Sequence, residues 1–345
     1  MPGVIESKFA NTLSMQELNV SNGLLGNRQA LDAAWGRDGY WFFRDVLNKD
    51  AIARARAEFI SVLEDLGVVE PGCTDAAVYN GAPLDDYPIR MGGDPTKDPL
   101  LARYPREILT EDPQIKAFFE ELFGDEVFWV PNSEFHAVPP DQEGFRYLKD
   151  GKDEKQSSRF NYVHADGPNN KGLPLRVCWI PLAPIDEETG GLAITEGLHK
   201  PRMNDFPRLA SGIKESDVPA DAWRRAEFQP GDLLVFALET PHSGLANQSD
   251  RFFRLSMDIR GMKKSENIPV VGTIAAIDQN AIAIDDNDGG RHVFRIDEDT
   301  FFRVSREGKS GMPLELAEIP QLAKAGDKVF AAFDHGTATF VRPQH

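Results

Sequence analysis

His164-Ala165-Asp166 is the short sequence of this chain whose residue types and spacing most directly suggest metal chemistry. In a β-strand, side chains two positions apart point to the same face, so both groups can enter the interior of one barrel. An imidazole and a carboxylate, completed by a distant histidine, form the facial triad of non-haem Fe(II) oxygenases, which leaves metal positions open for other ligands. Because His-x-Asp alone occurs by chance in many proteins, the interpretation needs a third ligand.

That third ligand is expected downstream, at the end of another strand. His242 follows Leu233–Phe236, an apolar run typical of a buried strand. After a turn, a further strand begins in which Arg254 and Ser256 share one face. A guanidinium fork beside a hydroxyl suits bidentate capture of a carboxylate in a semi-buried slot. Taken together, these residues favour an iron site with an acidic co-substrate over a surface histidine and a surface ion pair.

Composition narrows the classes of function. The 345 residues carry a formal net charge of −17, which argues against a nucleic-acid or anionic-membrane partner, because both require a basic surface. The two cysteines, Cys73 and Cys178, are too few for a disulfide framework and suit a reducing compartment. No stretch reaches the roughly 20 apolar residues of a membrane-spanning helix, and the N-terminal sequence lacks the layout of a signal peptide. We expect a cytoplasmic protein that acts on a small molecule.

The order of elements predicts a mainly β fold with flanking helices. Helical periodicity and turn residues predict helices at 27–35, 49–66 and 113–123, a strand at 39–47 and a loop at 73–99. Short β-like runs then follow at 127–130, 175–182, 191–194, 233–237 and 252–259. Many short strands after N-terminal helices favour a jelly-roll barrel with helices packed outside it.

The pattern changes again near residue 268. Strand-like runs at 271–277, 281–284, 292–296 and 328–333, with hairpin turns between the first three, predict a small β-barrel. We therefore expect three parts: an N-terminal arm at 1–26, the main domain at 27–262, and this barrel at 268–342. The barrel should supply no metal ligand and should serve stability, active-site lid placement or formation of a homodimer, because its sheet edges need cover.

Four features at matching spacing resemble the phytanoyl-CoA dioxygenase (PhyH-like) family of Fe(II)/2-oxoglutarate oxygenases over residues 30–262. The features are the segment Arg37–Val46 with its Asp-Gly-Tyr sequence, His164-x-Asp166, Gly190-Gly191-Leu192 with Gly197-Leu198-His199-Lys200, and Gly231-Asp232 before His242 with Arg254 behind it. The resemblance implies a double-stranded β-helix, which is a cupin-like jelly roll. It also implies Fe(II), 2-oxoglutarate and O₂, with His164, Asp166 and His242 as the catalytic metal ligands.

The resemblance also assigns roles to other residues. It implies that Arg254 binds the distal carboxylate of 2-oxoglutarate and that Ser256 assists. Trp179 matches a position that often lines the co-substrate site, although an ordinary core aromatic is an equal interpretation. Strand alternation makes His136 a candidate for contact with the substrate. The chain departs from the family where Glu196-Gly197-Leu198-His199 replaces the usual Pro-Gly-Ser-His.

The expected reaction is oxidation, foremost hydroxylation, of a small or medium-sized apolar metabolite, with release of succinate and CO₂. Asp166 favours this over halogenation, because halogenating relatives lose that carboxylate to make room for a halide. Two alternatives stay open from the sequence. One is a non-catalytic binding protein on an oxygenase scaffold, and the other is a 2-oxoglutarate-independent, metal-dependent cupin-like enzyme.

Overall fold

The structure is a computed structural model. It describes residues 15–84, 87, 100, 103–140, 163–167, 170, 173–200, 213, 215–303, 316–319 and 323–344. The chain folds as two compact units, one comprising 1–165 with 175–262 and the other 166–174 with 263–345. The short segment 166–174 therefore groups with the C-terminal part of the chain, although it lies far from that part in the sequence.

The first unit begins with helices whose ends follow local chemistry. They are α1 (Arg28–Asp38), α2 (Lys49–Asp65), α3 (Pro105–Thr110) and α4 (Pro113–Phe123). The side chain of Asp112 accepts from the backbone N–H groups of Gln114 and Ile115, which caps α4, and Gly124 ends this helix in the left-handed region. The predictions of α2 and α4 are confirmed. Helix α1 runs beyond its predicted end at residue 35, and α3 was not predicted.

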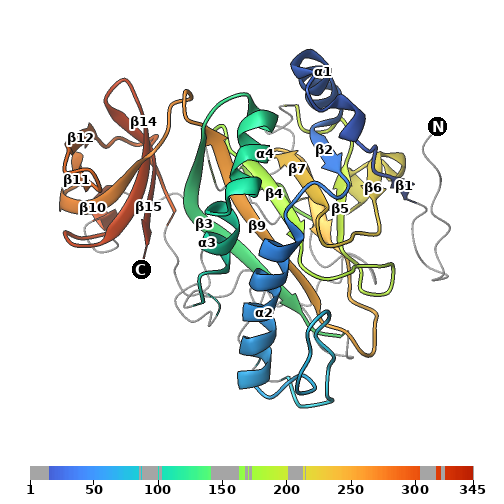
Figure 1. Cartoon of the computed structure of the whole chain (residues 1–345). Coiled ribbons are helices and arrows are strands. Elements are labelled where there is room, and N and C mark those ends of the chain that lie inside the picture. The colour runs from blue at the N-terminus through green and yellow to red at the C-terminus, as the bar shows by residue number, and fades with distance from the viewer. Residues whose placement is uncertain are drawn as a thin grey trace. The chain divides into compact units, whose positions relative to one another are not determined.

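The major sheet of this unit carries one face of the core. Its strands, in spatial order, are β2 (Tyr40–Phe43), β7 (Leu233–Ala237), β4 (Arg176–Pro181), β9 (Arg254–Lys263) and β3 (Val127–Val138). Figure 1 shows α2, α3 and α4 in front of this sheet. Alternate strand residues such as Cys178, Ile180 and Met257 join the cluster of buried side chains that includes Phe59 of α2 and Phe119 of α4.

A smaller sheet covers the opposite face. Its spatial order is β1 (Gln16–Glu17), β6 (Trp223–Arg225), β5 (Leu192–Thr195) and β8 (His242–Gly244). Phe228 packs against Trp179 and Phe42 of the major sheet, with ring centroids 4.7 and 5.5 Å apart. On the same face, the Phe236 ring lies 4.8 Å from that of His242. Two facing, mainly antiparallel sheets with helices on one side form the double-stranded β-helix predicted from the sequence.

Several strand boundaries differ from the sequence predictions for identifiable reasons. Strand β3 continues through Pro131 to Val138 because β3 lies at the edge of its sheet, where a missing N–H is tolerated. Strand β2 ends at Phe43, shortly before Asp45 adopts a φ of 54°. The prediction of an extended strand at His164-Ala165-Asp166 is wrong, because only His164 forms a β-bridge and Asp166 lies in a bend.

Other predicted segments agree only in part with the structure. The last part of the expected arm contains a strand, since Gln16–Glu17 pairs in parallel with β6. Residues 1–14 of the arm lie outside the described residues. The short strands β1, β6 and β8 were not predicted, because they are too short to show alternation. The loop expected at 73–99 lies partly outside the described residues, at 85–86 and 88–99.

The second unit contains a small closed barrel. Its strands are β10 (Val270–Ile277), β11 (Ala281–Asp286), β12 (Arg291–Arg295), β13 (Phe301–Phe302), β14 (Lys328–Asp334) and β15 (Thr337–Gln344). The order is β12-β11-β10-β14-β15-β13, and pairing of β12 with β15 closes the barrel around Ile274, Ile282, Ile284 and Phe294. The barrel was predicted, but β13 and β15 were not. Homodimer formation through this part stays a prediction.

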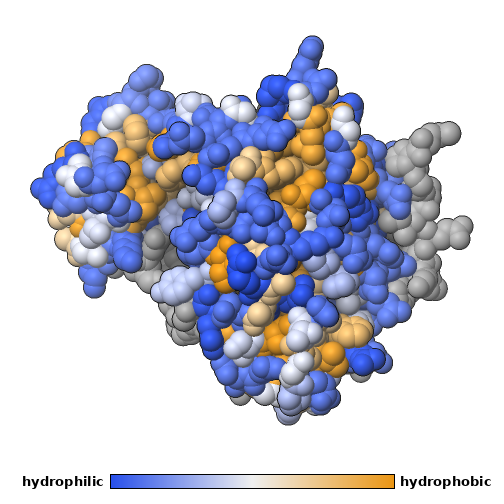
Figure 2. Space-filling model, in the orientation of Figure 1, coloured by the Kyte–Doolittle hydropathy of each residue, from blue (hydrophilic) through white to orange (hydrophobic). Residues whose placement is uncertain are grey.

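The surface agrees with the acidic composition. In the view of Figure 2, hydrophilic residues predominate and hydrophobic ones show in smaller areas. None of the helices in the described part of the chain is long and apolar enough to cross a membrane. The cytoplasmic location expected from the sequence stays a prediction.

Gly190, just before β5, lies against the backbone that follows β8, and a substitution there tests this close approach. A Cβ on Gly190, whose φ is +89°, would lie 2.6 Å from the carbonyl oxygen of Ala246 and 2.8 Å from that of Leu245. Gly81, with a φ of +84°, has nothing within 4 Å of its Cβ position. Gly81→Ala should lower the unfolding free energy by about 1 kcal/mol through backbone strain alone. Gly190→Ala should cost at least about 2 kcal/mol more, because the clashing atoms are backbone. Equal losses in chemical denaturation would contradict the close approach.

Candidate metal centre

Two histidines far apart in the sequence are joined through their backbones. The N–H of His164 donates to the carbonyl oxygen of His242 at 3.0 Å, and the N–H of His242 donates to that of His164 at 2.8 Å. This antiparallel bridge places the two imidazole centroids 4.2 Å apart. The backbone pairing therefore brings two nitrogen ligands to one point before any metal binds.

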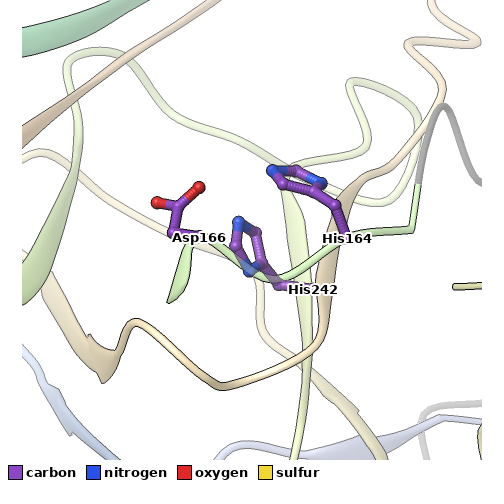
Figure 3. Close-up of side chains that lie close together, drawn as sticks. All are labelled: His164, Asp166 and His242. Atoms are coloured by element: carbon purple, nitrogen blue, oxygen red, sulfur yellow. The ribbon is translucent and has the colours of Figure 1, made fainter. Parts of the chain in front are cut away.

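Asp166 completes the group. The ligand atoms of His164, Asp166 and His242 all lie within 4.8 Å of one another, and Figure 3 shows the three side chains gathered together. Asp166 and His242 are buried and His164 is half-buried. Two imidazole nitrogens and one carboxylate oxygen are the ligand set that non-haem Fe(II) oxygenases use. The donor chemistry therefore fits iron.

The orientation of His242 also fits a metal ligand. Its Nδ1 lies 2.9 Å from the carbonyl oxygen of Thr240, an acceptor, so Nδ1 carries the proton. The second ring nitrogen, Nε2, is then free of a proton and offers its lone pair to a metal. Phe236 packs against the ring at 4.8 Å and restricts its rotation.

The backbone carbonyl of Asp166 is fixed by a side-chain hydrogen bond. Within the second unit, Nδ2 of the buried Asn170 donates to the carbonyl oxygen of Asp166 at 2.9 Å. Oδ1 of Asn170 accepts from Nη1 of Arg303 at 3.4 Å. Asn170 and Arg303 were missed from the sequence, because nothing in a polar loop signals which amide turns back onto a ligand.

Arg254 lies at the start of β9 as a buried cation. Its Nη1 donates to the carbonyl oxygens of Gly191 at 2.9 Å and Leu245 at 2.7 Å, and Nε has no hydrogen-bond partner among the described residues. Burial lowers the pKa of Arg254 to about 10, which still leaves it charged at neutral pH. In the described part of the chain no carboxylate pairs with it. Leu245 follows His242 by three positions. The carbonyl that Arg254 binds therefore lies roughly 10 Å along the chain from the metal ligand His242.

Ser256 and Trp179 share this face. Ser256 is 1% exposed and its Oγ has no hydrogen-bond partner in the part of the chain that the structure describes, whereas Trp179 is buried against Phe228. In the register of β4 and β9, Ser256 lies opposite Pro181 and Asp258 lies opposite Trp179. Ser256 and Trp179 thus lie on the interior face expected of them, and their roles stay predictions.

His136 has an acidic neighbour that the sequence did not reveal. Its Nε2 lies 3.7 Å from Oδ2 of Asp258, and Glu134 on the same strand lies 3.6 Å from Nη1 of Arg260. His136 was predicted from the sequence as a substrate contact, whereas Glu134, Asp258 and Arg260 were not predicted. The signal was present in β9, where Arg254, Ser256, Asp258 and Arg260 alternate with apolar residues.

Comparison with known proteins decides the family. The model of the phytanoyl-CoA dioxygenase (PhyH) family matches residues 35–256, more than half of the chain. The chain belongs to the phytanoyl-CoA dioxygenase family. It is a non-haem Fe(II)/2-oxoglutarate-dependent dioxygenase with the facial triad His164, Asp166 and His242.

Two curated relatives of this dioxygenase are named 1-deoxypentalenic acid 11-beta-hydroxylase. The one from Streptomyces arenae is 28% identical over 253 residues, covering 69% of this chain and 82% of its own length. The one from Streptomyces exfoliatus is 25% identical over 256 residues, with the same coverage. Among solved structures, the non-heme alpha ketoglutarate dependent carbocyclase SnoK from nogalamycin biosynthesis matches with a TM-score of 0.45 and 19% identity. That match covers 71% of this chain and 87% of SnoK.

When bound, iron supplies the activation of O₂, coupled to conversion of 2-oxoglutarate into succinate and CO₂. The dioxygenase's own residues provide the geometry for this. The His164–His242 bridge fixes the two imidazoles, Thr240 sets the protonation of one of them, and Asn170 holds the loop of the carboxylate ligand. Preorganised ligands of this kind spare the protein a rearrangement when the metal binds.

Removing either imidazole should abolish iron binding. We expect His164→Ala and His242→Ala to lose bound Fe(II) and the weak visible band that forms when Fe(II) and 2-oxoglutarate are added anaerobically, because two ligands do not hold the ion. His292→Ala is the control, since His292 lies in the second unit, 2.6 Å from Asp286. Retention of the band in both triad variants would show that the ligands are assigned wrongly.

Proposed function

We propose that this dioxygenase hydroxylates a small or medium-sized, largely apolar metabolite. The observation that carries the proposal is the complete triad, with the Asp166 carboxylate next to both imidazoles. A carboxylate in that position leaves no room for a halide, which favours hydroxylation over halogenation. The curated relatives, both named as hydroxylases of 1-deoxypentalenic acid, support this choice of reaction and a substrate of secondary metabolism.

We also propose that Arg254 binds the distal carboxylate of 2-oxoglutarate, with Ser256 and Trp179 beside it. A buried guanidinium without an anionic partner among the described residues is costly unless a ligand supplies the counter-charge. The Oγ of Ser256, which has no partner among the described residues, lies on the same face of β9 and is suited to accompany Arg254. In this arrangement the co-substrate extends from Arg254 toward the metal ligands.

The same observations weigh against the two alternatives. A binding protein on an oxygenase scaffold has no need to keep all three ligands, and they are all present. A 2-oxoglutarate-independent enzyme has no need for a buried arginine at the start of β9 that bonds only backbone carbonyls among the described residues. Both features therefore favour catalysis with 2-oxoglutarate.

Oxygen labelling tests the proposed reaction. In a screen of ring-bearing secondary metabolites under ¹⁸O₂, a substrate should give a product heavier by one labelled oxygen, together with about one succinate per product. The iron-free His242→Ala protein should give neither. A product without added oxygen would contradict hydroxylation, and turnover without succinate would favour the 2-oxoglutarate-independent alternative.

Substitution of Arg254 tests the co-substrate assignment. Arg254→Ala should raise the KM for 2-oxoglutarate about tenfold or more, because loss of a fork to a partly buried carboxylate costs about 2–5 kcal/mol. Arg254→Lys should recover only part of the loss, because a lysine keeps the charge without the fork. Arg251→Ala is the control, since the Arg251 guanidinium lies over the ring of Phe252. An unchanged KM in Arg254→Ala with a raised KM in Arg251→Ala would assign the role to Arg251.

A further inference from the structure

Side chains on the interior face of the major sheet form rows that cross the strands. The pairings of β2, β7, β4 and β9 set one row as Tyr40, Phe236, Val177 and Arg260. Phe236 packs against His242 at 4.8 Å, so this row lies at the level of the metal ligands. The row is largely apolar on three strands and becomes charged on β9.

The next row follows the same pattern, with apolar residues on β2, β7 and β4 and a charged residue on β9. It runs Phe42, Leu234, Trp179 and Asp258. The two rows are about 7 Å apart along the strands, and β9 lies about 10 Å from β7, two strand spacings away. Phe228 covers Trp179 and Phe42 of this row, so the charged end of the row on β9 is the part that a ring-bearing molecule of medium size at the iron could reach.

Asp258 and its neighbour His136 have unused hydrogen-bonding atoms. Their Oδ2 and Nε2 atoms are 3.7 Å apart, beyond a hydrogen bond. Oδ1 of Asp258 and Nδ1 of His136 are buried and have no hydrogen-bond partner among the residues that the structure describes. Buried polar atoms without partners are rare in native proteins because each lowers stability. The pair is therefore suited to a polar group that arrives with a ligand.

We infer that Asp258 and His136 bind a hydroxyl group of the substrate. This inference rests on the proposed function and names its substrate class: a largely apolar ring compound that carries a hydroxyl. A hydroxyl can donate to Oδ1 of Asp258 and accept from the imidazole of His136. A carboxylate would be repelled by Asp258. An ammonium group only donates hydrogen bonds, so it would leave the imidazole N–H of His136 without an acceptor.

Matched probes test the inference by binding rather than by activity. The protein is loaded anaerobically with Fe(II) and 2-oxoglutarate and titrated by calorimetry with 1-adamantanol, 1-methoxyadamantane, 1-adamantanecarboxylate and 1-adamantanamine. These probes share one apolar cage and differ in the polar group. The alcohol should bind at least about tenfold more tightly than each of the others, the gain expected of one hydrogen bond to a charged group. An ether, acid or amine that binds as tightly, or an alcohol that fails to bind at millimolar concentration, overturns the inference.

Variants test whether Asp258 and His136 cause the preference for the alcohol. Asp258→Ala should bring alcohol and ether to the same affinity, and Asp258→Asn should restore part of the difference, because its amide oxygen still accepts. His136→Phe should weaken the alcohol alone. Ser133→Ala is the matched control. The buried Oγ of Ser133 also has no partner within the described ranges, but Ser133 lies three positions from His136 on β3 and so projects to the other face.

The order of titrations separates this inference from the proposed function. Binding of 2-oxoglutarate to the iron-loaded protein is measured first in every variant. Its absence in the wild type refutes the proposed function, and the inference with it. Normal 2-oxoglutarate binding with an alcohol preference that survives Asp258→Ala refutes the inference alone.

Discussion

The iron centre depends on one pair of backbone hydrogen bonds, between His164 and His242. Without it, two imidazoles from distant parts of the sequence would have no common position, and Asp166 would have no neighbours to complete a triad. This pairing is an isolated bridge and is not extended by further paired residues, so the positions of both histidines must be supported by other contacts. Strand β7 and the Thr240 carbonyl support His242, and Asn170 supports the loop after His164.

Strand β9 shows how one element serves stability and chemistry together. Leu255, Met257 and Ile259 join the core beneath the helices, whereas the polar residues between them project toward the smaller sheet. A shift of the strand by one residue would exchange the two sets, burying charges under the helices and removing them from the interior. The register that stabilises the domain therefore also fixes the position of Arg254 and of Asp258.

The triad could be predicted from the sequence because the chain has few histidines and only His164 stands two positions from an aspartate next to a plausible strand. Helices α2 and α4 could be predicted because their apolar spacing and their end residues agree with one another. Residues whose role depends on strand pairing could not be predicted, and Asp258 became a candidate only once β9 was aligned beside His136. Asn170 and the short strand β8 carry no local signal, and Pro131 concealed the length of β3 because its edge position is a property of the whole sheet.

Locating the iron tests the account most directly. Crystals of the protein loaded anaerobically with Fe(II) and 2-oxoglutarate, measured at the iron absorption edge, should show one strong anomalous peak per chain. The peak should lie within coordination distance of His164, Asp166 and His242, with Nδ1 of His242 still donating to the Thr240 carbonyl. A peak at another group, such as His136 with Asp258, while the triad carries none, would contradict it.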